Sequence, residues 1–142
     1  MEPHAGQLVE VAGSPLESAS GVVIMVHGRN AGPPNILDLV PRLHRPQFAY
    51  VAPAAADRTW YPNSFLTEIA KNEPGISSGM FVLDHLTATL VAEGVPRNRI
   101  ILLGFSQGAC LASEFAVRHA QRFGGLIAFS GGLIGPVPSG DG

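Results

Sequence analysis

Four short apolar segments punctuate the chain, each too short for a helix and rich in branched side chains. Continuous apolar runs of this length predict strands that are covered on both faces, as in a parallel sheet. A fifth, more polar segment near the start predicts an edge strand. The predicted strands are residues 7–12, 21–26, 48–52, 100–103 and 125–130.

Between these strands the apolar positions recur every three to four residues, which predicts helices with one buried side. A Pro33-Pro34 pair is expected to open the first helix, Ser77 or Ser78 to cap the second, and Gly94 to end it. The three apolar stripes are Ile36, Leu37, Leu39, Val40 and Leu43; Val82, Leu83, Leu86, Leu90 and Val91; and Gly108, Ala109, Ala112, Phe115 and Ala116. Alternating strands and helices predict an α/β fold with a mainly parallel sheet and helices on both faces.

In such folds ligands bind beyond the carboxyl ends of the strands. Three segments with candidate chemistry follow strand ends here: His27-Gly28-Arg29, the irregular stretch at residues 53–75 that carries Trp60, and Ser106. An irregular stretch of that length in a small domain is usually functional. We therefore expect the three segments to meet at one rim of the sheet.

Composition narrows the class of protein. The 142 residues predict a single domain, 1–142, with 46% hydrophobic and 14% charged residues. A net charge of −2 and the lack of a basic run argue against nucleic acid as a partner. No signal peptide, membrane-length apolar run or metal-ligand spacing is visible, so the expectation is a cytoplasmic protein without a membrane span or bound metal. The lone Cys110 is expected to be a packed thiol.

The strongest motif is Gly104-Phe105-Ser106-Gln107-Gly108. It lies between a predicted strand and a predicted helix, which is the context of a nucleophile elbow. In that turn the serine hydroxyl projects from the sheet, and the following helix directs free N–H groups at the reacting centre. A β-carbon at either flanking glycine is expected to collide across the turn. Ser106 is the predicted nucleophile.

Together these segments resemble the phospholipase/carboxylesterase family, which are serine esterases of the α/β-hydrolase fold related to acyl-protein thioesterases and dienelactone hydrolases. The resemblance covers residues 21–135 and rests on four motifs. They are His27-Gly28-Arg29, Thr59-Trp60-Tyr61-Pro62, Asn72-Glu73-Pro74 and Gly104-Phe105-Ser106-Gln107-Gly108-Ala109. The resemblance implies hydrolysis of a small-molecule carboxylic ester without a cofactor.

Position by position, the resemblance implies that Ser106 is the nucleophile and that the backbone N–H groups of Arg29 and Gln107 form the oxyanion hole. His27 and Gly28 are expected to support or line the substrate pocket. Trp60 and Tyr61 are expected to line it as well, although a purely structural role for Trp60 is an equal alternative. Asn30 stands where relatives often carry glycine, and asparagine tolerates a left-handed backbone.

The resemblance also implies an acid and a histidine after the nucleophile, and the sequence ends one predicted strand beyond Ser106. The five histidines present, including His119 along the helix after Ser106, are not expected to complete a triad. We therefore expect a C-terminally incomplete hydrolase that is inactive or weakly active as given. The strand at residues 125–130 becomes an exposed apolar edge, which favours homodimer formation or aggregation.

Two alternatives stay open. The first is a non-catalytic module that binds a ligand near Trp60, and the second is a thioesterase acting on acylated thiols. The thioesterase differs from an esterase only in its leaving group, so the residues alone do not separate the two.

Overall fold

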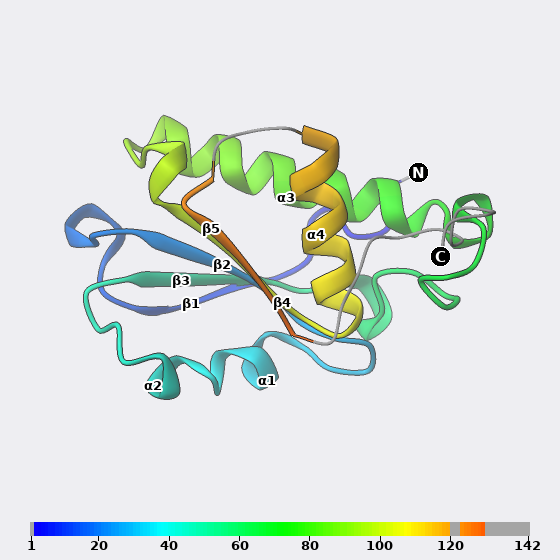
Figure 1. Cartoon of the computed structure of the whole chain (residues 1–142), viewed down its shortest axis with the longest axis horizontal. Coiled ribbons are helices and arrows are strands. Elements are labelled where there is room, and N and C mark those ends of the chain that lie inside the picture. Colours follow the sequence, from blue (N-terminus) through cyan, green and yellow to red (C-terminus); the bar gives the residue numbers. More distant parts are fainter. Residues whose placement is uncertain (1, 120–122, 130–142) are drawn as a thin grey trace, which may run out of the picture.

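A computed structural model describes residues 2–119 and 123–129, which form a five-stranded sheet with the order β1-β3-β2-β4-β5 (Figure 1). Only β1 runs antiparallel to its neighbour, so the sheet is mainly parallel, as predicted. Strands β2 and β3 are buried along their whole length. The strands are β1 (Val9–Gly13), β2 (Val22–Val26), β3 (Ala49–Pro53), β4 (Ile100–Phe105) and β5 (Gly125–Phe129).

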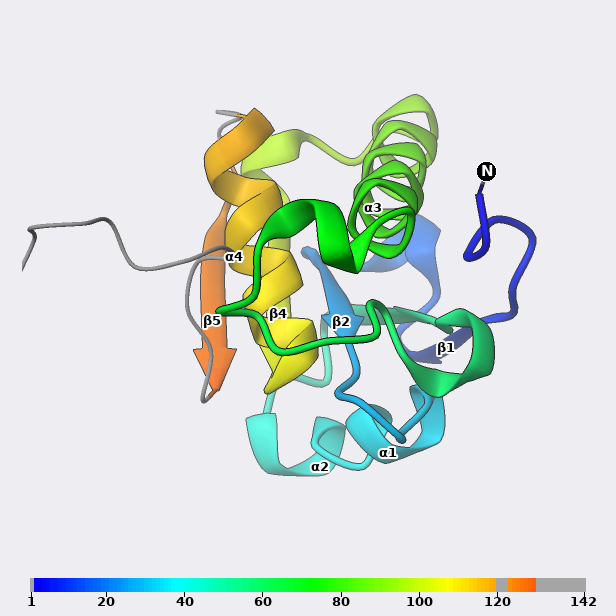
Figure 2. The same cartoon turned by 90° about the vertical axis from the view of Figure 1, so that its right-hand side faces the viewer.

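Helices cover both faces of the sheet, which confirms the predicted α/β arrangement. Helices α3 (Gly75–Ala92) and α4 (Gln107–His119) lie on one face, and α1 (Pro33–Leu37) and α2 (Val40–Leu43) lie on the other (Figures 1 and 2). The core on the α3 and α4 side includes Trp60, Leu83 and Leu111. The smaller core on the α1 and α2 side includes Met25, Ile36 and Tyr50.

The first predicted helix is in fact two short helices, and of its expected apolar stripe only Ile36 is fully buried. Pro41 explains the break. Its ring nitrogen has no hydrogen to donate to the carbonyl of Leu37, and the ring collides with that carbonyl in a continuous helix. The prediction of one helix was wrong because it followed the apolar spacing and overlooked this proline.

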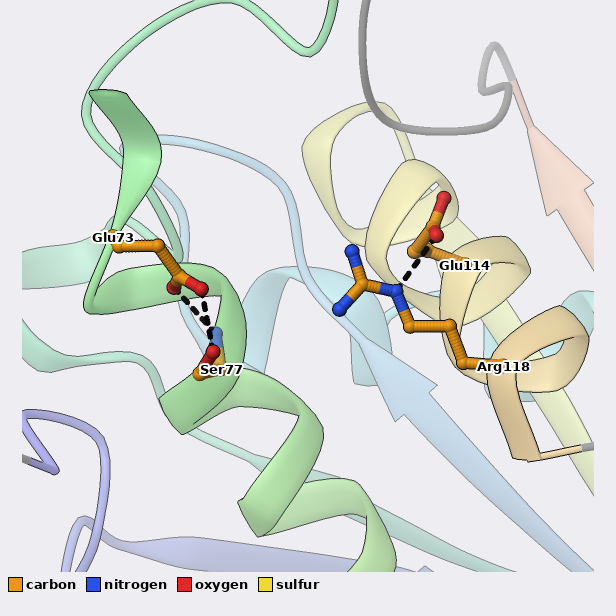
Figure 3. Close-up of polar contacts among 4 residues, drawn as sticks. All are labelled: Glu73, Ser77, Glu114 and Arg118. Atoms are coloured by element: carbon orange, nitrogen blue, oxygen red, sulfur yellow. Dashed lines mark hydrogen bonds and ion pairs between the residues drawn. The ribbon is translucent and has the colours of Figure 1, made fainter. Parts of the chain in front are cut away.

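The start of α3 also differs from the prediction, because neither Ser77 nor Ser78 caps it. The helix begins at Gly75, and the Glu73 carboxylate accepts hydrogen bonds from the N–H and the hydroxyl of Ser77, at 2.8 and 2.5 Å (Figure 3). A carboxylate at a helix N-terminus satisfies free N–H groups and suits the helix dipole. Gly94, with φ +101°, follows the end of the helix as expected.

Helix α3 is long and apolar enough to cross a membrane by length and composition, with a mean hydropathy of 1.2 over 18 residues. In the folded chain it packs its apolar side on the sheet, where Ile76, Leu83 and Leu90 are buried. That burial is typical of a core helix in a layered α/β domain. Helix α4 carries an ion pair between Arg118 and Glu114, 2.8 Å apart (Figure 3).

The segment between β3 and α3 is irregular, as predicted, with two 3-10 turns at Ala56–Arg58 and Ile69–Asn72. Two further 3-10 turns lie at Leu16–Ser18 and Arg97–Arg99.

Strand β5 pairs with β4 and has no second neighbour within the described residues. Leu126, Ile127 and Phe129 are 40–44% exposed, so the predicted exposed apolar edge is present in this part of the chain. Ser130, the last residue of the predicted strand, lies outside the described residues.

Candidate active site

Ser106 is the single residue between the end of β4 and the start of α4. Its side chain is exposed, and its φ of +55° lies in the left-handed region that non-glycine residues seldom adopt. Its N–H donates to the carbonyl of Phe129 at 2.8 Å, and its own carbonyl accepts from Cys110 N–H at 3.1 Å. Two backbone hydrogen bonds thus hold the serine in a strained conformation.

Both flanking glycines are required sterically. A Cβ on Gly104 would overlap the backbone of Gly108, which is the predicted collision across the turn. A Cβ on Gly108 would instead overlap the carbonyl oxygens of Val26 and His27, at the end of the neighbouring strand β2. The second glycine therefore lets α4 start directly against the segment that follows β2.

That segment, His27-Gly28-Arg29, lies against the serine. A Cβ built on Gly28 would be 3.2 Å from the Phe105 carbonyl oxygen and 3.5 Å from the Ser106 Cβ. Among residues 2–119 and 123–129, no acceptor takes a hydrogen bond from the backbone N–H of Arg29 or of Gln107. The two candidate N–H donors thus belong to segments in contact with Ser106, and neither has a partner within the described part of the chain.

His27 holds its segment through both ring nitrogens. Nε2 accepts from Ala55 N–H at 3.0 Å, so the proton belongs on Nδ1, which donates to the Gly28 carbonyl at 2.8 Å. Burial lowers the pKa of His27 below its ordinary value because the charged form loses hydration. His27 is therefore a neutral structural residue without a free nitrogen to serve as a base.

The Arg29 side chain fastens the loop between β3 and α3. Its guanidinium donates to the carbonyls of Pro62 and Asn63 at 2.9 and 2.8 Å and lies 6.0 Å from the centre of the Tyr61 ring. The buried Asn72 side chain holds Asn63 in turn, because its oxygen accepts from Asn63 N–H at 2.7 Å. Asn72 belongs to one of the four motifs, and sequence reasoning assigned it no role.

The Gln107 side chain fastens the same loop from the other side. Its oxygen accepts from Trp60 N–H and its nitrogen donates to the Tyr61 carbonyl, both at 2.7 Å. The Trp60 indole N–H then donates to the His27 carbonyl at 2.9 Å. These contacts close a circuit of buried hydrogen bonds from the start of α4 through Trp60 to the segment that carries Arg29.

His4, one of the five histidines not expected to complete a triad, belongs to this network. It is buried, its Nε2 donates to the Trp60 carbonyl at 2.7 Å, and its Nδ1 accepts from Ala56 N–H at 3.0 Å. The ring meets Trp60 edge-on at 5.0 Å between centres, while His27 stacks on Trp60 at 5.2 Å. Burial lowers the pKa of His4 as well. No local pattern around His4 signals these long-range contacts.

Several non-glycine residues at this end of the sheet have a left-handed backbone conformation. Asn30, Asp57, Arg58 and Ser106 all have positive φ, between +52° and +63°. Asn30 N–H donates to the Arg58 carbonyl at 2.8 Å, which joins the segment after β2 to the loop after β3. The expected left-handed conformation of Asn30 is thus present. Clustering of such conformations is typical of functional sites.

A pocket of about 350 Å³ opens beside the serine. Its lining comes from the segment after β2, from α1 and its surroundings, and from the end of β4. The lining residues are His27, Gly28, Arg29, Ala31, Asn35, Ile36, Leu39, Phe105 and Ser106. Within the described part of the chain, Trp60 and Tyr61 do not line it. This placement differs from the expectation.

Trp60 is instead fully buried, and Tyr61 is 2% exposed. Their indole and ring faces pack in the α3-side core, and their surfaces border a different pocket of about 240 Å³ that also touches His4. Burial raises the pKa of Tyr61, whose hydroxyl lies beside the Cys110 thiol without a nitrogen or oxygen partner among the described residues. The position of Trp60 is therefore that of a structural residue, the alternative to lining the substrate pocket.

The three remaining histidines belong to helices or to a helix end. His44 and His85 are exposed, on the end of α2 and on α3, and His119 is the last residue of α4. No described residue hydrogen-bonds the Ser106 side chain. No cluster of three side chains suited to a metal occurs within residues 2–119 and 123–129.

Comparison with known proteins identifies the family to which this chain belongs. A model of the phospholipase/carboxylesterase family matches residues 9–138. The chain belongs to this family. A solved phospholipase/carboxylesterase from Dyadobacter fermentans is 37% identical and superimposes with a TM-score of 0.92, covering 98% of this chain and 66% of its own. The solved esterase PE8 is 25% identical, with a TM-score of 0.72 over 88% of this chain and 64% of its own.

Curated relatives carry the name acyl-protein thioesterase 1. The protein from Eremothecium gossypii is 37% identical over 81 residues, which are 56% of this chain and 33% of the relative. The protein from Cryptococcus neoformans is 26% identical over 134 residues, which are 82% of this chain and 56% of the relative. This phospholipase/carboxylesterase family member thus matches about half the length, or less, of these relatives. Its fold is that of the α/β-hydrolases.

Proposed function

We propose that this protein is the nucleophile-bearing part of a serine hydrolase for carboxylic esters. The observation that carries the proposal is Ser106 itself, exposed at φ +55° between β4 and α4. The N–H groups of Arg29 and Gln107, on the segments beside it, have no partner among the residues that the structure describes. This arrangement supports a nucleophile elbow with a two-donor oxyanion hole.

In the proposed reaction the Ser106 hydroxyl oxygen attacks the ester carbonyl carbon and loses its proton to a base. The carbonyl oxygen becomes negatively charged and accepts hydrogen bonds from Arg29 and Gln107 N–H. Each such donor contributes about 3–4 kcal/mol to transition-state stabilisation. The base then protonates the departing alcohol, and water hydrolyses the acyl-serine to the acid and free Ser106.

We infer that the base and the acid that orients it lie outside the described residues. Both nitrogens of His4 and of His27 are engaged in structural hydrogen bonds, which supports this inference. We propose that the base and the acid come from a segment that pairs with the exposed edge of β5. Without them, slow hydrolysis from the oxyanion hole alone is expected, since proteases stripped of their triad keep a rate about 10³–10⁴ above water.

A fluorophosphonate probe tests the nucleophile, with the adduct located by mass spectrometry. The chain is treated alone and in a version extended by an acid- and histidine-bearing C-terminal segment of a relative. We expect a phosphonyl adduct on Ser106, faster in the extended version and absent from S106A. The matched variant S113A, which alters another serine about two turns further along α4, keeps the adduct. No adduct on Ser106 in the extended version contradicts the proposal and leaves a ligand-binding module.

A thioesterase activity is the second candidate, because curated relatives are named acyl-protein thioesterase 1. The same serine and donors serve either leaving group, and a thiolate leaves with less need of protonation. Rates on matched oxygen and sulfur esters of one acid distinguish the two. A much larger kcat/KM for the sulfur ester assigns thioesterase action, and comparable values assign general ester hydrolysis.

A further inference from the structure

The segment at residues 2–8, which leads into β1, is fastened to other parts of the chain. The N–H of His4 donates to the buried hydroxyl of Ser78 on α3 at 3.0 Å. The Leu8 carbonyl accepts from Ala54 N–H, just beyond β3, at 2.9 Å. Figure 2 shows this segment, in dark blue, beside α3. Strands β3 and β2 separate β1 from β4, so the link from this segment to the end of β4 runs through the loop between β3 and α3.

His4 is the residue at which this segment meets that loop. Its ring is 3% exposed, its Nε2 donates to the Trp60 carbonyl at 2.7 Å, and its Nδ1 accepts from Ala56 N–H at 3.0 Å. Gly75, at the start of α3, lies against the same Trp60 carbonyl, because a Cβ built there would overlap the oxygen. The neutral imidazole therefore holds two parts of the loop at once, one with a donor and one with an acceptor.

Both groups that the imidazole holds are bonded in turn to the segment after β2. The indole N–H of Trp60 donates to the His27 carbonyl at 2.9 Å. The carbonyl of Arg58, in the 3-10 turn that begins at the imidazole's other partner, accepts from Asn30 N–H at 2.8 Å. The residue two before Arg29 and the residue after it are thus both tied to the loop, close to the two places where the imidazole holds it.

We propose that His4 is a positioning residue for the oxyanion hole, because its neutral ring holds the loop that sets the Arg29 N–H. The inference rests on the proposed function and adds a residue that does not line the pocket beside Ser106. The Gln107 N–H lies at the first residue of α4 and is placed by that helix. The effect of His4 is therefore expected to fall on one of the two donors.

Protonation of His4 removes the acceptor from this arrangement. The charged ring carries a hydrogen on both nitrogens, so Nδ1–H then faces the N–H of Ala56 and repels it. Burial is the largest influence and lowers the pKa of His4, whereas the carbonyls of Trp60 and Gly75 and the carboxylate of Glu2 raise it. The other titratable groups near His4 line a pocket that it also lines or lie across Trp60; they are Asp57, Glu73, His85 and His27.

NMR of the ¹⁵N-labelled chain tests the positioning without any reaction, because the single tryptophan gives one indole signal. H4F keeps an aromatic ring and loses both hydrogen bonds, whereas the neutral amide of H4Q supplies a donor and an acceptor. In H4F we expect indole hydrogen exchange to accelerate at least about tenfold relative to the Ile24 N–H in buried β2. The order parameter of the Arg29 N–H falls from about 0.85 to below about 0.6, while that of Gln107 stays near 0.85. H4Q restores the wild-type values.

Kinetics of the extended version test the same role in hydrolysis. We expect H4F to lower kcat at least about tenfold with KM within about twofold, because an oxyanion donor acts in the transition state. H4Q is expected to keep kcat within about threefold at pH 7 and to lose less of it than wild type between pH 7 and 5. The matched variant H85F changes an exposed histidine of α3 that stacks on Phe81, and keeps the wild-type kcat.

The outcomes separate this inference from the proposed function. Disorder at Arg29 in H4F, without Ser106-dependent hydrolysis in the wild-type extended version, supports the positioning role and contradicts the hydrolase. Ser106-dependent hydrolysis with an unchanged kcat in H4F supports the hydrolase and overturns the positioning role. Equal changes at Arg29, Gln107 and Ile24 show a contribution to stability alone and also overturn it. If H4F does not fold, identical losses of kcat in wild type and H4Q between pH 7 and 5 overturn it.

Discussion

The two sides of β4 are built in opposite ways. On one side, beyond the ends of β2 and β4, irregular segments are fastened by buried hydrogen bonds from Gln107, Trp60 and His27. On the other side, β5 exposes the apolar side chains Leu126 and Ile127 and has no second strand beside it within the described residues (Figure 1).

Among the described residues, the first region has its hydrogen bonds satisfied, whereas the second presents an open strand edge. Hydrogen bonds of His27, Trp60 and Gln107 fasten the segments around Ser106, so the two candidate donors are held in place before any ligand arrives. Such preorganisation is what makes an oxyanion hole effective. The edge of β5 instead leaves backbone groups and apolar surface available to another strand.

The largest difference is expected when a glycine in each region is changed to alanine. G108A places a methyl group against the carbonyls of Val26 and His27 and is expected to cost about 3 kcal/mol or more of unfolding free energy. In G125A on β5 the nearest atoms are Ile101 side-chain carbons at 3.9 and 4.0 Å, so a change within about 0.5 kcal/mol is expected. Urea unfolding measures both, and equal losses would contradict the comparison.

A pair of neighbouring aromatic residues tests the hydrogen-bond circuit. W60F removes the indole N–H that donates to the His27 carbonyl and leaves a void in the core, at an expected cost of about 2–3 kcal/mol. Y61F removes a buried hydroxyl without a nitrogen or oxygen partner in the described residues, so its stability is expected to be unchanged or higher. Thermal unfolding distinguishes these signs. A larger loss in Y61F would show that its hydroxyl has an important partner.

Lowering the pH is expected to reduce the free energy of unfolding through His4 and His27, which lie in the region around Ser106. Burial lowers the pKa of both in the folded protein, so below pH of about 6.5 the unfolded chain binds protons that the folded chain does not. Their contribution to stability is therefore full above that pH and is lost as pH falls towards the folded pKa values. Urea unfolding from pH 7 to 5 measures this slope, which is expected to be smaller in H4Q. An identical slope in H4Q would remove His4 from the explanation.

The smallest effect on folding is expected at β5. I127K adds a charge to an exposed position, so unfolding free energy is expected to change by no more than about 0.5 kcal/mol. Sedimentation velocity is expected to show less self-association, because lysine on an edge strand opposes pairing. V11K provides the control on β1, at the other edge of the sheet. Equal effects of the two variants would show that association is not specific to β5.

Local patterns in the sequence predicted the strands, the positions of α3 and α4, and the serine between β4 and α4. Each of these depends on neighbouring residues: apolar runs, helical spacing and two glycines around Ser106. Pro41 was an equally local signal and explains the divided first helix. The start of α3 also departed by a few residues, because a carboxylate before the helix took the role assigned to a serine.

The residues themselves thus determined that an exposed serine follows a central parallel strand in an α/β fold. Tertiary structure decided that Trp60 and Tyr61 lie in the core rather than in the pocket, and that His4 and Asn72 help to hold the loops around Ser106. The physical reason is that periodicity reports the environment of a side chain along its own element. Hydrogen bonds between residues as far apart as His4 and Trp60 depend on how the elements pack.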